Sequence, residues 1–139
     1  MAIQRTLCII KPDAVEKGKA GAILQRVLEE GFKIRGLRQV HLSLRQAEGF
    51  YAVHRGRPFF NDLCEFMSRG PVVVAALERD EAVQHWRQVI GATDPAKAEP
   101  GTIRKLYGAH VGENAVHGSD SEQNGRLECA YFFAEMDLS

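Results

Sequence analysis

The sequence predicts an α+β sandwich of the ferredoxin-like type, in which helices pack on a four-stranded antiparallel sheet. Two observations lead to this fold class. Short apolar runs alternate with segments of helical periodicity in the order strand, helix, strand, helices, strand, helix, loop, strand, which is a β-α-β-β-α-β arrangement with extra helices between the middle strands. The chain has 139 residues, a length that fits one domain, so we expect residues 1–139 to form a single unit.

Four apolar segments are the predicted strands. Residues 6–10 and 72–77 are continuous apolar runs of the kind found in buried strands. Residues 32–42 alternate in polarity, and Leu37 breaks this alternation beside Gly36, which predicts a bulge or bend there. Residues 127–133 are the last apolar run and are expected to form the final strand.

Helical spacing of apolar residues is found between these strands. The expected helices lie around residues 23–28, 45–53, 59–66 and 83–90. In the third, Phe59, Leu63 and Phe66 are expected to form the buried stripe. The fourth is expected to begin at Asp80 as its N-cap, and Arg87 falls off its apolar stripe.

Composition restricts the class of protein. Lys and Arg together number 18, as do Asp and Glu, whereas a general nucleic-acid binder usually carries an excess of basic residues. No apolar run approaches the roughly 18 residues that a membrane span needs, and no signal peptide is recognised. Cys8, Cys64 and Cys129 are far apart and flanked by apolar residues, so we expect buried free thiols and a cytoplasmic protein.

The common nucleotide-binding loops are absent from the sequence. The only Gly-Lys pair, Gly18-Lys19, is followed by Ala20, so there is no phosphate loop of the G-x-x-x-x-G-K-[ST] type. The G-x-G-x-x-G fingerprint of dinucleotide binders is missing as well. If the protein handles phosphate groups, it must therefore bind them with cationic side chains rather than with a cradle of backbone amides.

The segment 92–124 is rich in glycine and has only short apolar pieces. A long irregular segment in a small domain is usually functional or disordered, and this one contains His110, Asn114, His117 and Ser119, which favours function. His110 and His117 lie seven residues apart, but no further histidine or cysteine pattern supports direct metal ligation. The remaining histidines are expected to have structural or surface roles; they are His41, His54 and His85.

His117 has the chemistry of a nucleophile. Imidazole has an unperturbed pKa of about 6.5. Much of it is therefore neutral at pH 7 and can accept and release a phosphoryl group. Gly118 leaves space beside it, Ser119 and Ser121 supply small donors, and Glu128 can hydrogen-bond one ring nitrogen and orient the other. A loop histidine that only hydrogen-bonds the backbone fits the spacing as well, and the residues alone leave both interpretations open.

Several blocks of the sequence resemble one family. Residues 116–121, Val-His-Gly-Ser-Asp-Ser, preceded by Asn114, resemble the active-site signature of the nucleoside diphosphate kinases. Residues 7–15 resemble the first strand and Lys-Pro-Asp turn of that family, and residues 57–60, 91–95 and 100–104 resemble three more of its blocks in the right order. The resemblance covers essentially the whole chain. Its departures, Arg57, residues 105–108 and Glu113, touch none of the functional positions.

The resemblance implies an activity and a set of roles. Members move the γ-phosphoryl group of a nucleoside triphosphate, typically ATP, to a nucleoside diphosphate through a phosphohistidine, which here would be His117. It implies Mg²⁺ held mainly through the nucleotide phosphates, with no dedicated metal ligands, and a homo-oligomer, with a tetramer favoured and a hexamer possible. By position, the resemblance makes Glu128 the partner of the histidine and places Tyr51 near it. It implies that the phosphates are contacted by Lys11, Arg87, Arg104 and Thr93. It further implies that Asn114 and Lys11 contact the ribose and that Phe59 stacks on the base.

Two other functions compete with the kinase. The first is a nucleotide-binding regulatory module that has lost transfer, against which His117 and the cations are all present. The second is a nucleic-acid binder that stacks bases on an aromatic sheet face, against which the balanced charge and the lack of an aromatic-rich strand both speak. We expect neither membrane association nor specific nucleic-acid binding.

Overall fold

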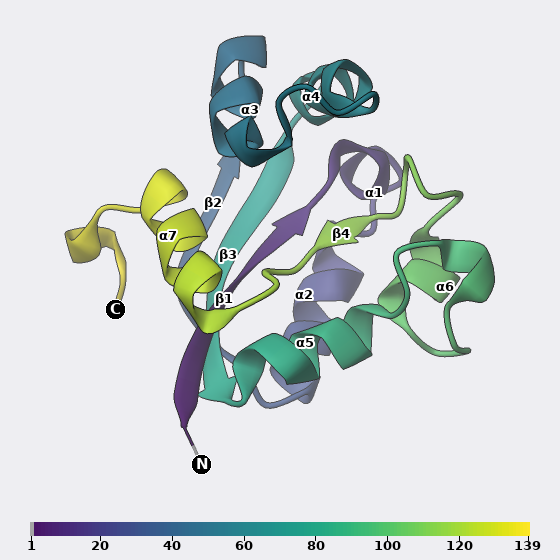
Figure 1. The fold of residues 1–139 in the computed structure, drawn as a ribbon. Coiled ribbons are helices and arrows are strands. Elements are labelled where there is room, and N and C mark those ends of the chain that lie inside the picture. Colours follow the sequence, from purple (N-terminus) through teal and green to yellow (C-terminus); the bar gives the residue numbers. More distant parts are fainter. Residues whose placement is uncertain (1) are drawn as a thin grey trace.

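A computed structural model describes residues 2–139 and confirms the predicted α+β fold class. Four strands form one sheet in the order β2-β3-β1-β4, and every neighbouring pair is antiparallel (Figure 1). The strands are β1 (Ile3–Ile10), β2 (Lys33–Val40), β3 (Val72–Asp80) and β4 (Val116–His117). β1 and β3 occupy the centre of the sheet, so the two continuous apolar runs of the sequence are its most enclosed strands.

Helices cover both faces of this sheet (Figure 1). They are α1 (Pro12–Glu16), α2 (Ala20–Glu29), α3 (Leu44–Phe50), α4 (Phe60–Ser68), α5 (Ala82–Ile90), α6 (Ile103–Tyr107) and α7 (Glu122–Phe132), with 3₁₀ turns at Ala52–His54, Pro95–Lys97 and Glu135–Asp137. One core contains residues of α3, α4 and α7, and the other contains residues of α1, α2, α5 and α6.

The alternation of side chains along β1 separates the two cores. Leu7 and Ile9 pack under α3, α4 and α7, whereas Cys8 and Ile10 pack on the opposite face. Successive side chains of a strand point to opposite faces, and here both sets are fully buried. The three cysteines are free thiols and all are buried, as the sequence predicted.

The predicted final strand is wrong. Residues 127–133 belong to α7 and the short connection after it, and the fourth strand is the two-residue β4 inside the irregular segment. Ser121 begins the helix, since its hydroxyl accepts a hydrogen bond from the Asn124 amide at 3.1 Å. The buried positions Gly125, Cys129 and Phe132 recur at helical spacing, so the apolar run is one face of a helix rather than a strand.

Two smaller expectations on the helices are corrected. In α4 the buried residues are Phe60, Cys64 and Met67 rather than the predicted stripe, which leaves Phe59 47% exposed. Asp80 ends β3, and the N-cap of α5 is Glu81, which has a left-handed backbone with φ of 50°. The expected irregularity in the second strand is confirmed: the pairing of β2 with β3 shifts register between Ile34 and Gly36.

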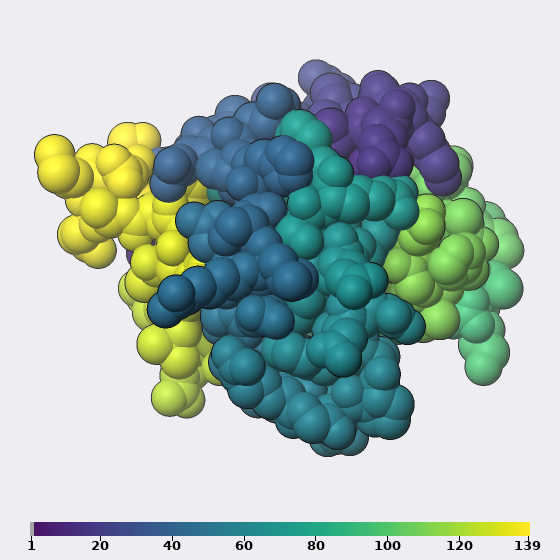
Figure 2. Space-filling model, turned by 90° about the horizontal axis from the view of Figure 1, so that it is seen from above, coloured from purple at the N-terminus to yellow at the C-terminus, as the bar shows by residue number. Residues whose placement is uncertain are grey.

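Seen from above, the segment of α3 and α4 covers the middle of the molecule (Figure 2). The C-terminal residues lie on one side of it, and the segment around residues 100–115 lies on the other. Within the described part of the chain, no helix combines the length and apolar character needed to cross a membrane.

Candidate functional site

Local main-chain contacts fix the loop that leads to His117. Ala115 has a left-handed backbone with φ of 76°, which is uncommon for a residue other than glycine. Its amide donates to Oδ2 of Asp13, a buried residue of α1, at 3.1 Å, and its carbonyl accepts from the Lys11 amide at 2.8 Å. His117 then pairs with Ile9 of β1. The loop is therefore anchored to the first strand and helix, just where the histidine begins to face outward.

The imidazole of His117 is held by a carboxylate. Nε2 lies 2.8 Å from Oε1 of Glu128, so the hydrogen bond expected from the sequence is present, although Glu128 projects from a helix and not from a strand. A carboxylate only accepts hydrogen bonds, so Nε2 carries the proton and Nδ1 keeps its lone pair. Among the described residues, no hydrogen bond reaches Nδ1. The ring of Phe50 packs edge-on against the imidazole at 5.7 Å.

Ser119 fixes the carboxylate in turn. Its hydroxyl donates to Oε1 of Glu128 at 2.6 Å and accepts from the Leu7 amide at 3.0 Å, and its own amide donates to the Thr6 hydroxyl at 3.2 Å. From the sequence, Ser119 is expected to be a donor beside the histidine. The fully buried side chain instead points at the carboxylate that orients the histidine.

The surroundings of His117 favour its neutral form. Burial lowers the pKa of His117 below its usual value. The hydrogen bond and charge of Glu128 raise that pKa, while the charges of Lys11 and Arg104 lower it further. The net direction is downward, so at neutral pH the neutral ring, with its proton on Nε2, is favoured.

Two cations, the buried Arg104 and the half-buried Lys11, lie near the histidine. Arg104 of α6 donates to the carbonyl of Gly91 at 3.0 Å and to that of Val116 at 2.9 Å, and burial lowers its pKa to about 10. Lys11 donates to Oδ1 of Asn114 at 2.9 Å. Burial, together with the charge of Arg104, lowers the pKa of Lys11 to about 8. Both side chains stay cationic at neutral pH, and neither has a carboxylate partner among the described residues.

These groups border a cleft of about 1300 Å³. Of the residues predicted for the site, five line it: Arg87, Thr93, Arg104, His117 and Glu128. Lys11 and Asn114 adjoin its wall, because Asn114 Nδ2 donates to the carbonyl of Thr93 at 3.0 Å. Sequence reasoning missed other lining residues, namely Phe50, Val53, His54, Lys97 and Asp120.

The fold and this cleft can be compared with known proteins. The sequence model described as nucleoside diphosphate kinase matches residues 4–138, which is nearly the whole chain. The chain belongs to the nucleoside diphosphate kinase family.

Individual relatives agree with this assignment. A nucleoside diphosphate kinase of Sorangium cellulosum is 60% identical over 139 residues, covering 100% of this chain and 96% of the relative. One of Geobacter sulfurreducens is 56% identical over 136 residues, covering 98% and 99%. The crystal structure of the Aquifex aeolicus nucleoside diphosphate kinase has a TM-score of 0.97 at 45% identity and covers 99% of this chain and 100% of its own. A halophilic nucleoside diphosphate kinase from Halobacterium salinarum in complex with CDP has a TM-score of 0.94 at 38% identity, covering 99% and 92%.

Two residues that the family resemblance assigned to the site lie outside the cleft lining of this nucleoside diphosphate kinase. Phe59 is half exposed and packs edge-on against His54 at 5.4 Å. Tyr51 is buried, packs edge-on against Phe50 at 4.9 Å, and has no hydrogen-bond partner for its hydroxyl among the described residues. His54, expected to have a structural or surface role, lines the cleft beside both rings. The nearness of His54 to Phe50 and Phe59 in the sequence was the signal that could have placed it at the cleft.

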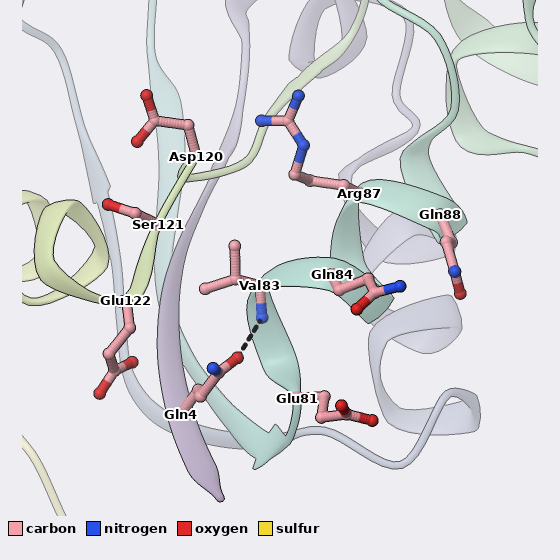
Figure 3. A pocket seen from close by; sticks show the side chains of 9 residues that line it. All are labelled: Gln4, Glu81, Val83, Gln84, Arg87, Gln88, Asp120, Ser121 and Glu122. Atoms are coloured by element: carbon pink, nitrogen blue, oxygen red, sulfur yellow. Dashed lines mark hydrogen bonds between the residues drawn. The ribbon is translucent and has the colours of Figure 1, made fainter.

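A second hollow of about 480 Å³ adjoins the cleft (Figure 3). It is polar, and its lining comes from residues along α5, from the start of β1 and from the turn that leads into α7. Arg87 and Asp120 line both hollows. Figure 3 shows the guanidinium of Arg87 extending toward the segment that carries Asp120, which agrees with the prediction that Arg87 points away from the core.

Proposed function

We propose that this nucleoside diphosphate kinase moves the γ-phosphoryl group of a nucleoside triphosphate, typically ATP, to a nucleoside diphosphate through a phosphohistidine at His117. The observation that carries the proposal is the state of the imidazole. Nε2 is bound to Glu128, while Nδ1 is left with a lone pair in a ring that belongs to the wall of the cleft.

The two half-reactions balance without an external base. The Nδ1 lone pair forms a bond to the γ-phosphorus as the bond between that phosphorus and the bridging oxygen breaks, and the diphosphate leaves with the electron pair. The ring then carries a phosphoryl group on Nδ1 and a proton on Nε2, so positive charge on the imidazole lies against the Glu128 carboxylate 2.8 Å away. A second diphosphate reverses these steps.

Cationic side chains would bind the transferring group. Lys11, Arg87 and Arg104 are the proposed phosphate ligands, since phosphoryl transfer places negative charge on the non-bridging oxygens. The Thr93 hydroxyl would add one donor, and Asn114 with Lys11 would meet the ribose. We also propose that Phe59 stacks on the base, where its exposed ring would accept any π-face, and that Tyr51 supports the histidine region from behind Phe50.

Magnesium would enter as part of the nucleotide substrate. No group of three or more His, Cys, Asp or Glu side chains within residues 2–139 could hold a metal ion. The cleft nevertheless contains Asp120, and a carboxylate oxygen is the hard donor that Mg²⁺ accepts while most of its ligands are phosphates and waters. When bound, the ion would neutralise charge on the β- and γ-phosphates.

The test separates transfer from nucleotide binding. The protein is incubated with γ-labelled ATP and Mg²⁺, and a different nucleoside diphosphate is then added. We expect an acid-labile, base-stable phosphoenzyme that the acceptor discharges, with no label in His117→Gln and normal labelling in the matched loop variant His110→Gln. Label retained in His117→Gln overturns the assignment of that residue. A folded wild-type protein that takes up no label favours the alternative, a nucleotide-binding regulatory module.

We also propose a homo-oligomer, with a tetramer favoured over a hexamer, and a cytoplasmic location. β2 is the outer strand of the sheet and exposes half of Leu37, which supports an interface there. The buried free thiols support a reducing compartment. Sedimentation of the wild-type protein and of Leu37→Glu tests the interface, because a charge at a subunit contact lowers the assembled mass.

A further inference from the structure

The only tryptophan of the sequence, Trp86, is hydrogen-bonded to the main chain of the proposed phosphate acceptor. It is fully buried on α5, and its Nε1 donates to the carbonyl oxygen of His117 at 3.1 Å. β4 has only two residues and lies at the edge of the sheet, with β1 as its one strand neighbour among the described residues. A side-chain donor therefore adds a restraint that such a short strand needs.

The indole is fitted against the residue that follows the histidine. A Cβ atom at Gly118 would lie 2.7 Å from Cδ1 of Trp86, closer than non-bonded carbon atoms approach. It would also lie 3.2 Å from Nε1 of the same ring, which is a tight contact. Gly118 was expected to leave space beside His117. On this side the indole fills that space. Phe32 packs edge-on against the same ring at 5.6 Å, so the ring is held from both directions.

The position of Trp86 also links the nucleophile to a phosphate ligand. Arg87, the next residue of α5, lines the cleft together with His117. Figure 3 shows this arginine beside the segment that carries Asp120, three residues after the histidine. The Trp86–His117 hydrogen bond joins α5 to β4 at this point, and so sets the separation between the cation and the ring.

Resting on the proposed role of His117, we propose that Trp86 is a positioning residue for phosphoryl transfer. Two restraints then fix Nδ1: Glu128 holds the far side of the ring, and the indole N–H holds the backbone from which the ring projects. Reacting atoms must meet at the correct distance and angle, and small displacements of a nucleophile slow a reaction strongly. Trp86 touches neither the substrate nor the reacting nitrogen, so its removal affects the rate of transfer and not the affinity for nucleotide.

The experiment removes the donor and keeps the shape. Because the chain contains one tryptophan, growth of a tryptophan auxotroph on benzothienylalanine replaces the N–H of Trp86 alone with sulfur. We expect the rate of His117 phosphorylation by ATP, measured by rapid quench, to fall about tenfold, the equivalent of one hydrogen bond. The Kd for ADP should stay within twofold. Trp86→Phe should show the same division between rate and affinity.

The control and the opposite outcomes are defined by the same assay. Phe32→Leu disturbs the packing of the indole without removing its donor, so it should lower the unfolding temperature and leave the phosphorylation rate within twofold. In wild-type protein labelled with ¹⁵N, the single indole N–H resonance should shift when His117 is phosphorylated.

A wild-type rate in the benzothienyl protein, or an indole resonance that stays unchanged on phosphorylation, overturns the role of Trp86 and leaves that of His117 intact. If the benzothienyl protein fails to fold, the indole resonance of the wild type decides. Failure of the wild-type protein to form any phosphohistidine refutes the proposed function itself.

Discussion

Replacing Glu128 by glutamine tests the central hydrogen bond of the site. The carboxylate accepts from His117 Nε2 at 2.8 Å and from the Ser119 hydroxyl at 2.6 Å. Hydrogen bonds to charged groups contribute about 1.5–3 kcal/mol. The side chains of His117 and Glu128 are only 17% and 24% exposed, so solvent weakens this pair only in part. Glutamine keeps an acceptor oxygen for Nε2 but loses the charge, and the difference of about 1–1.5 kcal/mol between charged and neutral hydrogen bonds lowers the rate by about five- to tenfold.

The assay for this variant measures phosphoenzyme formation in a single turnover. We expect Glu128→Gln to lower the rate constant by the factor above while the Kd for nucleotide changes little, because Glu128 holds the ring rather than the phosphates. Glu122→Gln is the matched control, since it removes a charge from the first turn of the same helix and should keep the wild-type rate.

The pH profile gives a second reading of the same variant. Glu128 raises the pKa of His117, so its removal lowers that pKa and moves the acid limb of the rate to lower pH. An unchanged single-turnover rate, or an acid limb that moves upward, would refute the orientation of His117 by Glu128.

Three further predictions follow from single contacts. In the proposed mechanism Lys11, with a pKa of about 8, binds phosphate in its protonated form, and His117, whose pKa is lowered, reacts in its neutral form. kcat/KM measured across pH should therefore fall above about pH 8, its acid limb should lie below the pH at which a free imidazole titrates, and Lys11→Arg should remove only the alkaline limb. Ala115→Gly relieves a left-handed backbone and should raise the free energy of unfolding in urea by about 0.5–1 kcal/mol; a loss would contradict strain at this residue. Gly125→Ala places a Cβ in steric clash with the carbonyl oxygen of Arg5, so we expect the unfolding temperature to fall by about 10 °C, and an unchanged value would contradict the close approach of α7 to β1.

The sequence predicted the centre of the sheet better than its edges. β1 and β3 are long apolar runs buried on both faces, and such a pattern is distinctive. β4 has two residues, too few for any periodicity to show. The prediction therefore assigned the last strand to residues 127–133, where aromatic residues without β-branched neighbours form one side of a helix. Two features of the sequence favour a helix here: Ser121 is a good N-cap residue, and Gly125, Cys129 and Phe132, which are buried, recur at helical spacing.

The pairing of His117 with Glu128 was predictable although the element that carries Glu128 was not. The contact needs only that the two residues come together, and the family resemblance supplied that pairing. Trp86 and Ser119 were different cases. Their roles depend on hydrogen bonds to particular main-chain groups across the fold: Trp86 donates to the carbonyl of His117, 31 residues away, and Ser119 accepts from the amide of Leu7, 112 residues away. Periodicity places Trp86 in the core, but it does not show which carbonyl its N–H meets.

The proposed site would allow a chain of zero formal charge to bind a polyphosphate. Without a glycine-rich phosphate loop, the charge must come from side chains. Desolvation and a neighbouring cation lower the pKa of both Lys11 and Arg104, and the neighbour is Arg104 for Lys11 and Arg87 for Arg104. Repulsion among these cations and their desolvation disfavour the ligand-free arrangement. A bound phosphate group would offset both effects, since each cation would gain the partner that the described residues do not provide. Burial lowers the pKa of His117, and the charges of Lys11 and Arg104 lower it further, which favours the neutral ring in the free protein. We therefore propose that Lys11 and Arg104 have two effects. They help to keep Nδ1 of His117 unprotonated before the nucleotide binds, and their uncompensated positive charge favours binding of the triphosphate.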